Sequence, residues 1–496
     1  MRGQLTVVIL VDMKLTPFGP YFRFFVGLLL SIFVFSHFVF LNADPDISMA
    51  TGSRAAWTDD GILLCQVRNF LNGHGFHLLE SDGFIKAPLY SAYQGLTLGL
   101  FGTHQQVARA SVLLLVVVSF VLVVLNRSTR VQTLVLFATT YLLLPIHQHS
   151  HLALSEMAAI SWVLVSAWSY CNFTSSGSYR WIMASQLSVL IAVGMKIQFL
   201  YLLPLPLLNY WFFSNKSGQL LSPTQFIALV AIPVVLCFGY MLAFADEWFL
   251  FQKAQSGSIF ADDISIEAIR ENVQNYLFRK KILFFTLSFL TSFFCFIVIW
   301  FDAKSRVSIS PLTYFSLVWF VLELHKLPME YLPIRYMVGF YFSMGLFLSS
   351  ALVDAIKVGV SRHLSAPAIA FVFLAFIVNL YVLKDVFKNR SYLLDSIQKN
   401  MAHKYKKEDI LVGPWAPALT WGSSCRAYPV WDGFSNSVLS VSQKYPTAVL
   451  TEEQGLDSGI DWNTFLGRGI SLDSTSVVFY RLADWQVGVY QTQGPN

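Results

Sequence analysis

The stretch AWTDDGILLCQVRNFLNGHGFHLLESDGFIKAPLY, residues 56–90, follows the first apolar run of the chain, which covers about residues 24–41. A run of that length can cross a bilayer as one helix. The stretch behind it includes two adjacent carboxylates, two histidines, a lysine and a proline. So much polarity beside a membrane span has two ordinary explanations, a solvated loop or a site at the membrane surface.

The composition places the chain in a membrane. Of its 496 residues, 55% are hydrophobic and only 13% are charged, whereas soluble domains carry about 25% charged residues. We therefore expect a polytopic α-helical membrane protein. The net charge of +5 is spread along the chain without a Lys/Arg block, so nucleic acid is not an expected partner.

Ten further apolar runs follow, and with the first they predict about eleven membrane-spanning helices. The block 181–213 contains either two short helices that meet at Lys196 or one long bent helix. The further runs are at about 107–125, 131–146, 152–171, 181–195, 197–213, 224–245, 281–301, 308–327, 334–353 and 366–384.

The charges of the short loops predict the orientation. If the first run crosses outward, every short inner loop carries Lys or Arg, as the positive-inside rule requires, provided that 181–213 crosses twice. The odd number of spans then places 42–106, 246–280 and the C-terminal segment on the outer side. The basic residues of the inner loops are Arg127, Arg130, Arg180, Lys216, Lys304, Arg306, Lys357 and Arg362.

The chain divides into two domains. Residues 1–386 form the predicted transmembrane domain, with 42–106 as its first outer loop. The runs DILVG, TAVLT, SVVFYRL and VGVYQT after the last span are typical of strands, so 387–496 is expected to be a small soluble α/β domain. The polar loop 246–280 is expected to contain a helix. Cys65 and Cys425 fall on the same side, which allows a disulfide between them.

Asp59 and Asp60 lie at the start of a predicted helix. Acids in a first turn are favoured by the helix dipole. One of them could instead serve as a general base, or the two could hold a divalent cation.

Lys86 stands just ahead of Pro88, which favours a helix start. Its ammonium either reaches toward lipid headgroups or contacts the phosphate of a lipid-linked substrate.

Several other polar residues interrupt or border apolar runs. A charged side chain that faces lipid costs several kcal/mol of free energy, so we expect Glu156 and Lys196 both to face a cavity. His147, His149 and His151 alternate with period two, which suits one face of a strand; a zinc site, a polar substrate contact and a solvated loop all remain open. A last cluster at the outer end of a span either lines the cavity or anchors the interface: Glu323, His325, Lys326 and Glu330.

The first outer loop resembles that of the membrane glycosyltransferases of the GT-C fold, in the branch of the protein O-mannosyltransferases and the aminoarabinose transferase of lipid A. That branch carries Asp-Glu where this chain has Asp59 and Asp60, and it continues with a Gly-rich stretch and a Lys-x-Pro motif, here KAPLY from Lys86 to Tyr90. Asp59 therefore takes the position of the catalytic acid.

Four further segments resemble the same branch, in the same order and on the same side. HQHSHLALSE (147–156) supplies Glu156, VGMKIQFLYLLPLPLL (193–208) supplies Lys196, and MEYLPIRYMVGFYFSMGL (329–346) supplies Arg335. ILVGPWAPALTW, residues 410–421, resembles the start of the branch's soluble outer domain.

The resemblance implies a glycosyltransferase that moves a sugar from a polyprenyl-phosphate donor to a lipid, glycan or protein acceptor, with inversion. Asp59 would be the base, and Lys86, Lys196 and Arg335 would stabilise the phosphate. The remaining substrate contacts expected from it are Asp60, Tyr90, His149, Glu156 and Tyr336.

The implied setting is a bacterial inner membrane, with membrane lipids around the protein and the active site facing the periplasm. The sequence has no P-loop and no GxGxxG, and no cofactor is expected beyond a divalent cation, which stays open. Two alternatives remain: a glycan ligase with a lipid-diphosphate donor, and a transporter or flippase. A transporter predicts charges within the spans and inverted repeats, whereas here the charges gather on one face.

Overall fold

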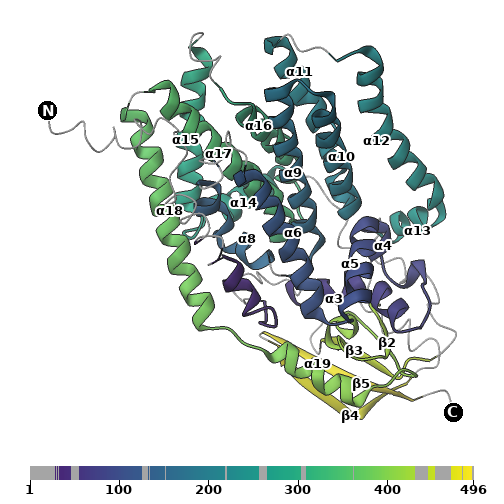
Figure 1. Cartoon of the computed structure of the whole chain (residues 1–496). Helices are drawn as coiled ribbons and strands as arrows, with labels where there is room; N and C mark the ends of the chain where they lie inside the picture. The colour runs from purple at the N-terminus through teal and green to yellow at the C-terminus, as the bar shows by residue number, and fades with distance from the viewer. Residues whose placement is uncertain are drawn as a thin grey trace.

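In the computed structural model of the chain, a bundle of helices carries a small β-sheet at one end (Figure 1). The structure describes residues 28, 31, 33–45, 55–125, 132, 135–150, 152–217, 221–255, 265–302, 309–360, 362–430, 445–452, 471–482 and 484–493.

The bundle surrounds one long helix, α17 (Val338–Val358), whose residues from Val338 to Ala355 are all buried. Five described helical stretches are long and apolar enough to cross a membrane: Gln105–Val123, Pro223–Ala243, Leu283–Phe301, Ile334–Val358 and Ser365–Lys404. The other bundle helices are α6 (Gln105–Leu125), α9 (Ser155–Ser176), α10 (Tyr179–Met195), α11 (Leu205–Ser217), α12 (Pro223–Ala243), α15 (Leu283–Phe301), α16 (Pro311–Glu323) and α18 (Arg362–Lys388).

The chain breaks at Lys196. Helix α10 ends at Met195, and Lys196 itself is extended, with φ −157° and ψ 114°. The short helix η4 (Ile197–Leu202) and then α11 follow. Of the two alternatives for 181–213, the structure therefore has two helices that meet at Lys196.

The first outer loop is largely helical and lies at the same end of the bundle as the sheet (Figure 1). Helix α5 begins at Pro88 as expected. The expected start of α3, in contrast, was wrong. This helix begins at Ala55, so Asp59 and Asp60 lie in its second turn, where the dipole of the helix end has largely decayed. The elements of this region are α3 (Ala55–Leu71), η2 (Leu78–Glu80), α4 (Gly83–Lys86) and α5 (Pro88–Phe101).

The loop 246–280 contains two helices, α13 (Ala245–Gln255) and α14 (Ile266–Leu277), which confirms the helical prediction. Short elements lie between the longer bundle helices: η3 (Phe137–Tyr141), α8 (Leu144–His149), η6 (Leu324–Lys326) and η7 (Ile334–Met337).

The C-terminal segment forms a five-stranded sheet in the order β2-β1-β3-β5-β4. Strands β2 and β3 pair with β1 in parallel, and β5 pairs with β3 and β4 antiparallel. All four strands predicted from the sequence are present. The elements are α19 (Leu393–Lys404), β1 (Ile410–Val412), α20 (Ala416–Leu419), β2 (Arg426–Tyr428), β3 (Ala448–Glu452), β4 (Ser471–Leu482) and β5 (Trp485–Gln493).

The sheet shares its core with α3. Trp57, on α3, is buried in the same cluster as Leu411 of β1 and Trp415. At Gly61 the two parts come so close that a Cβ atom would lie 2.6 Å from the backbone nitrogen of Ala418. The first outer loop and the C-terminal domain are therefore packed as one body.

The two outer cysteines are not bonded. Cys65 and Cys425 are both buried and free, so the structure does not form the disulfide that their common side allows. The Cys65 thiol is instead turned back onto its own helix, where Sγ donates to the carbonyl oxygen of Ile62 at 3.4 Å.

We expect Gly61→Ala to destabilise the protein by about 1–3 kcal/mol, because the added methyl group overpacks a backbone contact. This loss should outweigh the gain of about 1 kcal/mol that alanine brings to a helix. The midpoint of thermal unfolding in detergent measures the effect. Gly95→Ala in α5 is the control, since its Cβ would meet Val67 at an ordinary 3.5 Å. Equal midpoints for the two variants would contradict the close packing of α3 on α20.

Candidate active site

A chain of buried charges joins four segments at the outer ends of the helices. Arg335 Nε lies 3.1 Å from Asp59 Oδ2 and 3.7 Å from Glu156 Oε1. Lys196 Nζ lies 2.5 Å from the same Glu156 oxygen. Two carboxylates and two cations thus form one cluster, and no side chain in it is more than 16% exposed.

Local structure explains how these residues meet. Glu156 is in the first turn of α9, where the helix dipole stabilises a carboxylate. Lys196 projects from the extended break after α10. Arg335 lies in η7, directly after Pro333 and directly before α17. A cation at the start of a helix is unfavourable on its own, so the two acids offset its cost.

Tyr336 and Lys86 border the cluster. The centre of the Tyr336 ring lies 5.4 Å from Lys196 Nζ and 5.0 Å from Arg335 Cζ, as in cation–π contacts. Lys86 also acts electrostatically on Tyr336. Its ammonium lies 3.2 Å from Asp82 and 4.9 Å from the centre of the Phe251 ring, and its side chain is 27% exposed. Lys86 is thus the most accessible cation of this group.

A second buried cluster supports the backbone at Tyr336. The Glu323 carboxylate accepts hydrogen bonds from Tyr201 (2.6 Å), Trp319 (2.9 Å) and Lys326 (2.6 Å). Lys326 also donates to the carbonyl oxygen of Tyr336 at 2.9 Å. Glu323 and Lys326 are therefore buried and paired with each other, whereas His325 is exposed. The cavity expected for this group stays a prediction.

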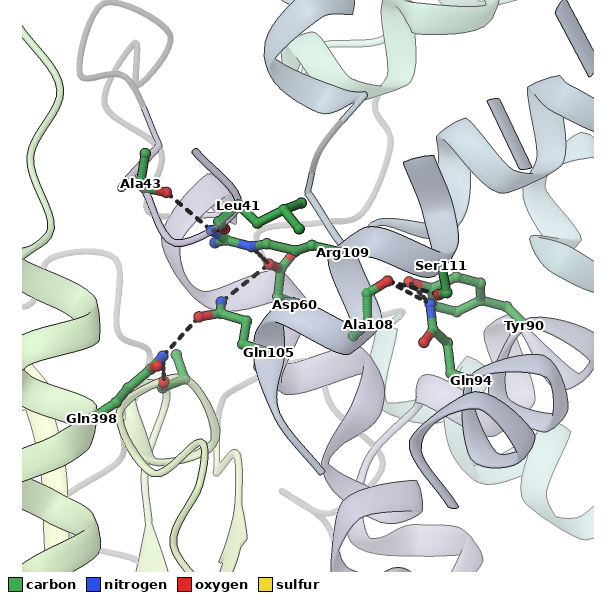
Figure 2. Close-up of polar contacts among 11 residues, drawn as sticks. Leu41, Ala43, Asp60, Tyr90, Gln94, Gln105, Ala108, Arg109, Ser111 and Gln398 are labelled. Carbon is green, nitrogen blue, oxygen red and sulfur yellow. Dashed lines mark hydrogen bonds and ion pairs between the residues drawn. The ribbon is translucent and has the colours of Figure 1, made fainter. Parts of the chain in front are cut away.

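Asp60 and Tyr90 have hydrogen-bond partners outside the charge cluster. Asp60 is 1% exposed and pairs with Arg109 at 3.0 Å. Tyr90 is fully buried, and its hydroxyl oxygen accepts a hydrogen bond from Gln94 at 3.2 Å (Figure 2). Gln94 also donates to the carbonyl oxygen of Ala108 at 3.2 Å, which fastens α5 to α6.

The histidines lie on a helix, so the expectation of a strand was wrong. His147 and His149 belong to α8, where residues two apart project in different directions. His147 stacks on His37 with ring centres 4.2 Å apart. His149 Nδ1 donates to the carbonyl oxygen of Pro145 at 2.6 Å and lies within electrostatic range of Glu156. His151 lies outside the described residues.

The geometry does not favour a cation between Asp59 and Asp60. The two carboxylates point to different guanidinium groups, those of Arg335 and Arg109. Within the part of the chain that the structure describes, no group of three His, Cys, Asp or Glu residues could hold a metal ion.

The environment of Asp59 suits a proton acceptor. Burial raises the pKa of its carboxyl above the ordinary value of 3.8, while Arg335 opposes that rise. A carboxylate with a raised pKa holds a proton more strongly than an exposed one does. Asp59 is also only partly covered, in contrast to Asp60.

Sequence reasoning missed the polar residues around Asp60, namely Arg109 and Gln105. Both lie at the start of an apolar helix, α6, and are buried there. The argument applied to Glu156, that a buried charge in an apolar run needs a partner, applies equally to Arg109 and could have found it.

We expect Lys196→Met to destabilise the protein by about 3 kcal/mol, because the longer pair with Arg335 is then the one ion pair left to the buried Glu156 among the described residues. Adding Glu156→Gln should recover most of the loss. Lys399→Met is the control, since Lys399 is 72% exposed in its pair with Asp395, and such surface pairs contribute about 0–1 kcal/mol. Thermal unfolding in detergent reports all three variants. A double variant no more stable than Lys196→Met would contradict a direct pair.

The fold is similar to that of solved membrane enzymes. ArnT from Cupriavidus metallidurans bound to undecaprenyl phosphate superposes with a TM-score of 0.50 at 14% identity, covering 94% of this chain and 97% of ArnT. The same protein in the apo state gives a TM-score of 0.54 at 13% identity, covering 94% and 98%. No family model and no curated protein sequence matches the chain. The chain therefore has the fold of ArnT, the GT-C fold that the first outer loop predicts.

Proposed function

We propose that the protein is a membrane glycosyltransferase that transfers a sugar from a polyprenyl-phosphate donor to an acceptor on the outer face. The observation that carries the proposal is the cluster of Asp59, Glu156, Lys196 and Arg335 at the outer ends of apolar helices. It would offer a base and two cations side by side for a lipid-linked phosphate.

The cations suit a departing phosphate. Arg335 lies beside both Asp59 and Glu156, and a guanidinium group presents five N–H donors, which suits the oxygens of a phosphate. Lys196 and the more accessible Lys86 add charge on the sides of Tyr336. Fixed cations stabilise the negative charge that develops as the sugar–phosphate bond breaks.

Asp59 is the proposed base. It would accept the proton of the acceptor's hydroxyl or amine while that group attacks the anomeric carbon. Attack opposite the departing phosphate inverts the anomeric centre. His149 and Tyr336, which border the cluster, are proposed to contact the sugar or the phosphate. Glu156 orients Lys196 and Arg335 through its ion pairs.

The similarity to ArnT bound to undecaprenyl phosphate supports a polyprenyl phosphate as the lipid. We retain 1–386 as the transmembrane domain, 387–496 as the outer domain, and a bacterial inner membrane with a periplasmic site as the setting.

The charged cluster argues against a transporter, because it lies at the ends of α9 and α10 and not along them. A ligase that takes a lipid diphosphate remains the second candidate, since it also needs cations at this place.

The first test is transfer itself. Wild-type protein in lipid vesicles, given radiolabelled polyprenyl-phosphate sugars and an envelope extract, should label an acceptor. Asp59→Asn should lower the rate at least about 100-fold, the scale of a general base. Glu408→Gln, at an exposed carboxylate, is the control and should keep the wild-type rate. Undiminished transfer by Asp59→Asn would remove Asp59 as the base, and transfer only from diphosphate donors would favour the ligase.

The pH dependence should follow Asp59. A base works only when ionised, and burial raises the pKa of this carboxyl above 3.8. Activity should therefore fall as the pH drops, with the midpoint of kcat/KM above that of an ordinary Asp. Measurement of kcat/KM from pH 4 to 8 at saturating acceptor, an interval chosen around carboxyl pKa values, tests this. The residual rate of Asp59→Asn should lack the same fall.

A further inference from the structure

We propose that Asp60 is a positioning residue, and that a buried polar chain from Arg109 through Asp60 and Gln105 to Gln398 lets the C-terminal domain set the orientation of Asp59. This replaces the substrate contact that the resemblance implies for Asp60. The proposal rests on the proposed role of Asp59 as the base.

Asp59 and Asp60 are neighbours on α3, but their side chains face two different environments. Successive side chains of a helix point about 100° apart. Asp59 accordingly reaches Arg335 in the charge cluster, while Asp60 reaches Arg109 on α6. Both partners of the second pair are 1% exposed. A sugar or acceptor molecule therefore has no path to Asp60 in this arrangement.

The Asp60 carboxylate is the centre of a small network (Figure 2). Its Oδ2 accepts from Arg109 Nε at 3.0 Å and from Gln105 Nε2 at 3.2 Å. Arg109 Nη1 also donates to the carbonyl oxygens of Leu41 (2.7 Å) and Ala43 (3.0 Å). The network thus fastens the segment after the first helix and the start of α6 to the catalytic helix α3.

The network continues into the C-terminal domain. Gln398, on α19, donates through Nε2 to Gln105 Oε1 at 3.0 Å and to the carbonyl oxygen of Ala418 at 2.9 Å (Figure 2). Ala418 belongs to α20, which packs against Gly61 of α3. The domain therefore holds α3 at two neighbouring points, by direct packing and through the two glutamines.

The ion pair between Asp60 and Arg109 lacks the bidentate geometry that stabilises such a pair most. Its contact is single, between Nε and Oδ2, and neither Asp60 Oδ1 nor Arg109 Nη2 has a hydrogen-bond partner among the described residues. A buried pair with unsatisfied atoms is weak evidence for stability and better explained by a geometric role. The geometry it fixes is the rotation of α3, which carries Asp59 one residue away.

A small error in that rotation would be costly. A displacement of about 1 Å in a reacting group can lower a rate about 100-fold. Removal of the hydrogen bond between Gln398 and Gln105, the uncharged part of the network, should therefore reduce kcat. Donor binding should stay almost unchanged, because the proposal assigns it to Lys86, Lys196 and Arg335.

The test uses the full-length protein in lipid vesicles with the variant Gln398→Leu, which removes the amide without leaving a buried charge. The neighbouring Lys399→Leu is the control. We expect kcat at least about tenfold lower in Gln398→Leu, an unchanged donor KM, and a shifted acidic limb of the pH profile. Faster amide hydrogen exchange in Ala55–Leu71, without a general increase, should accompany these changes. Gln398→Asn, which keeps the amide but shortens it, serves as a milder second variant if the first does not accumulate.

The outcomes separate the two proposals. Unchanged kcat and unchanged exchange in Ala55–Leu71 would overturn the positioning role, and so would a rise in exchange over the whole protein with a lower unfolding midpoint. Faster exchange confined to α3, in a preparation whose wild type transfers no sugar, would support the positioning of α3 while refuting the glycosyltransferase.

Discussion

A charge placed among apolar helices has to be paired, and the arrangement of the outer helix ends depends on that constraint. Glu156 can begin α9 inside the bundle because Lys196 and Arg335 neutralise it. Lys196 reaches it because the chain is extended between α10 and η4. Arg335 reaches it because η7 places the side chain just before α17. The ends of these three segments therefore meet at a single carboxylate.

The helix α3 connects this charged region to the sheet. One side of it presents Asp59 to Arg335, another presents Asp60 to Arg109, and Trp57 is buried in the core of the C-terminal domain. A domain that shares its core with α3 does not pack as a separate unit. The boundary near residue 387 thus divides the sequence into two parts. In the structure, the C-terminal part packs together with α3 of the first outer loop.

Much of this arrangement could be predicted from the sequence. The free-energy cost of a charge in an apolar run, and the periodic spacing of apolar residues in a helix or strand, can both be read from neighbouring residues. An acid or a lysine in an apolar run predicts a side chain that turns away from the lipid, and Glu156 and Lys196 are buried against each other. The cavity expected beside them stays a prediction. The four strands β1, β3, β4 and β5 follow from their runs of strand-forming residues, and the break at Lys196 was one of the two alternatives that the sequence left open. The direction of Asp60 could not be predicted, since its partner Arg109 comes from a distant helix. The histidine alternation misled because α8 is too short to show a helical period. Strand β2, with the sequence RAY, lacks the run of branched apolar residues that marks the equally short β1, ILV.

Helix α12 contrasts with the rest of the bundle. Only Leu229 and Pro233 are buried along it, and at its far end the Tyr240 hydroxyl makes long hydrogen bonds of 3.4 and 3.3 Å to the carbonyl oxygens of Phe84 and Ile85. These carbonyls immediately precede Lys86. An element held by so few contacts moves at little cost in free energy. The helix beside Lys86 can therefore shift without disturbing the packing of α17, whose residues from Val338 to Ala355 are all buried.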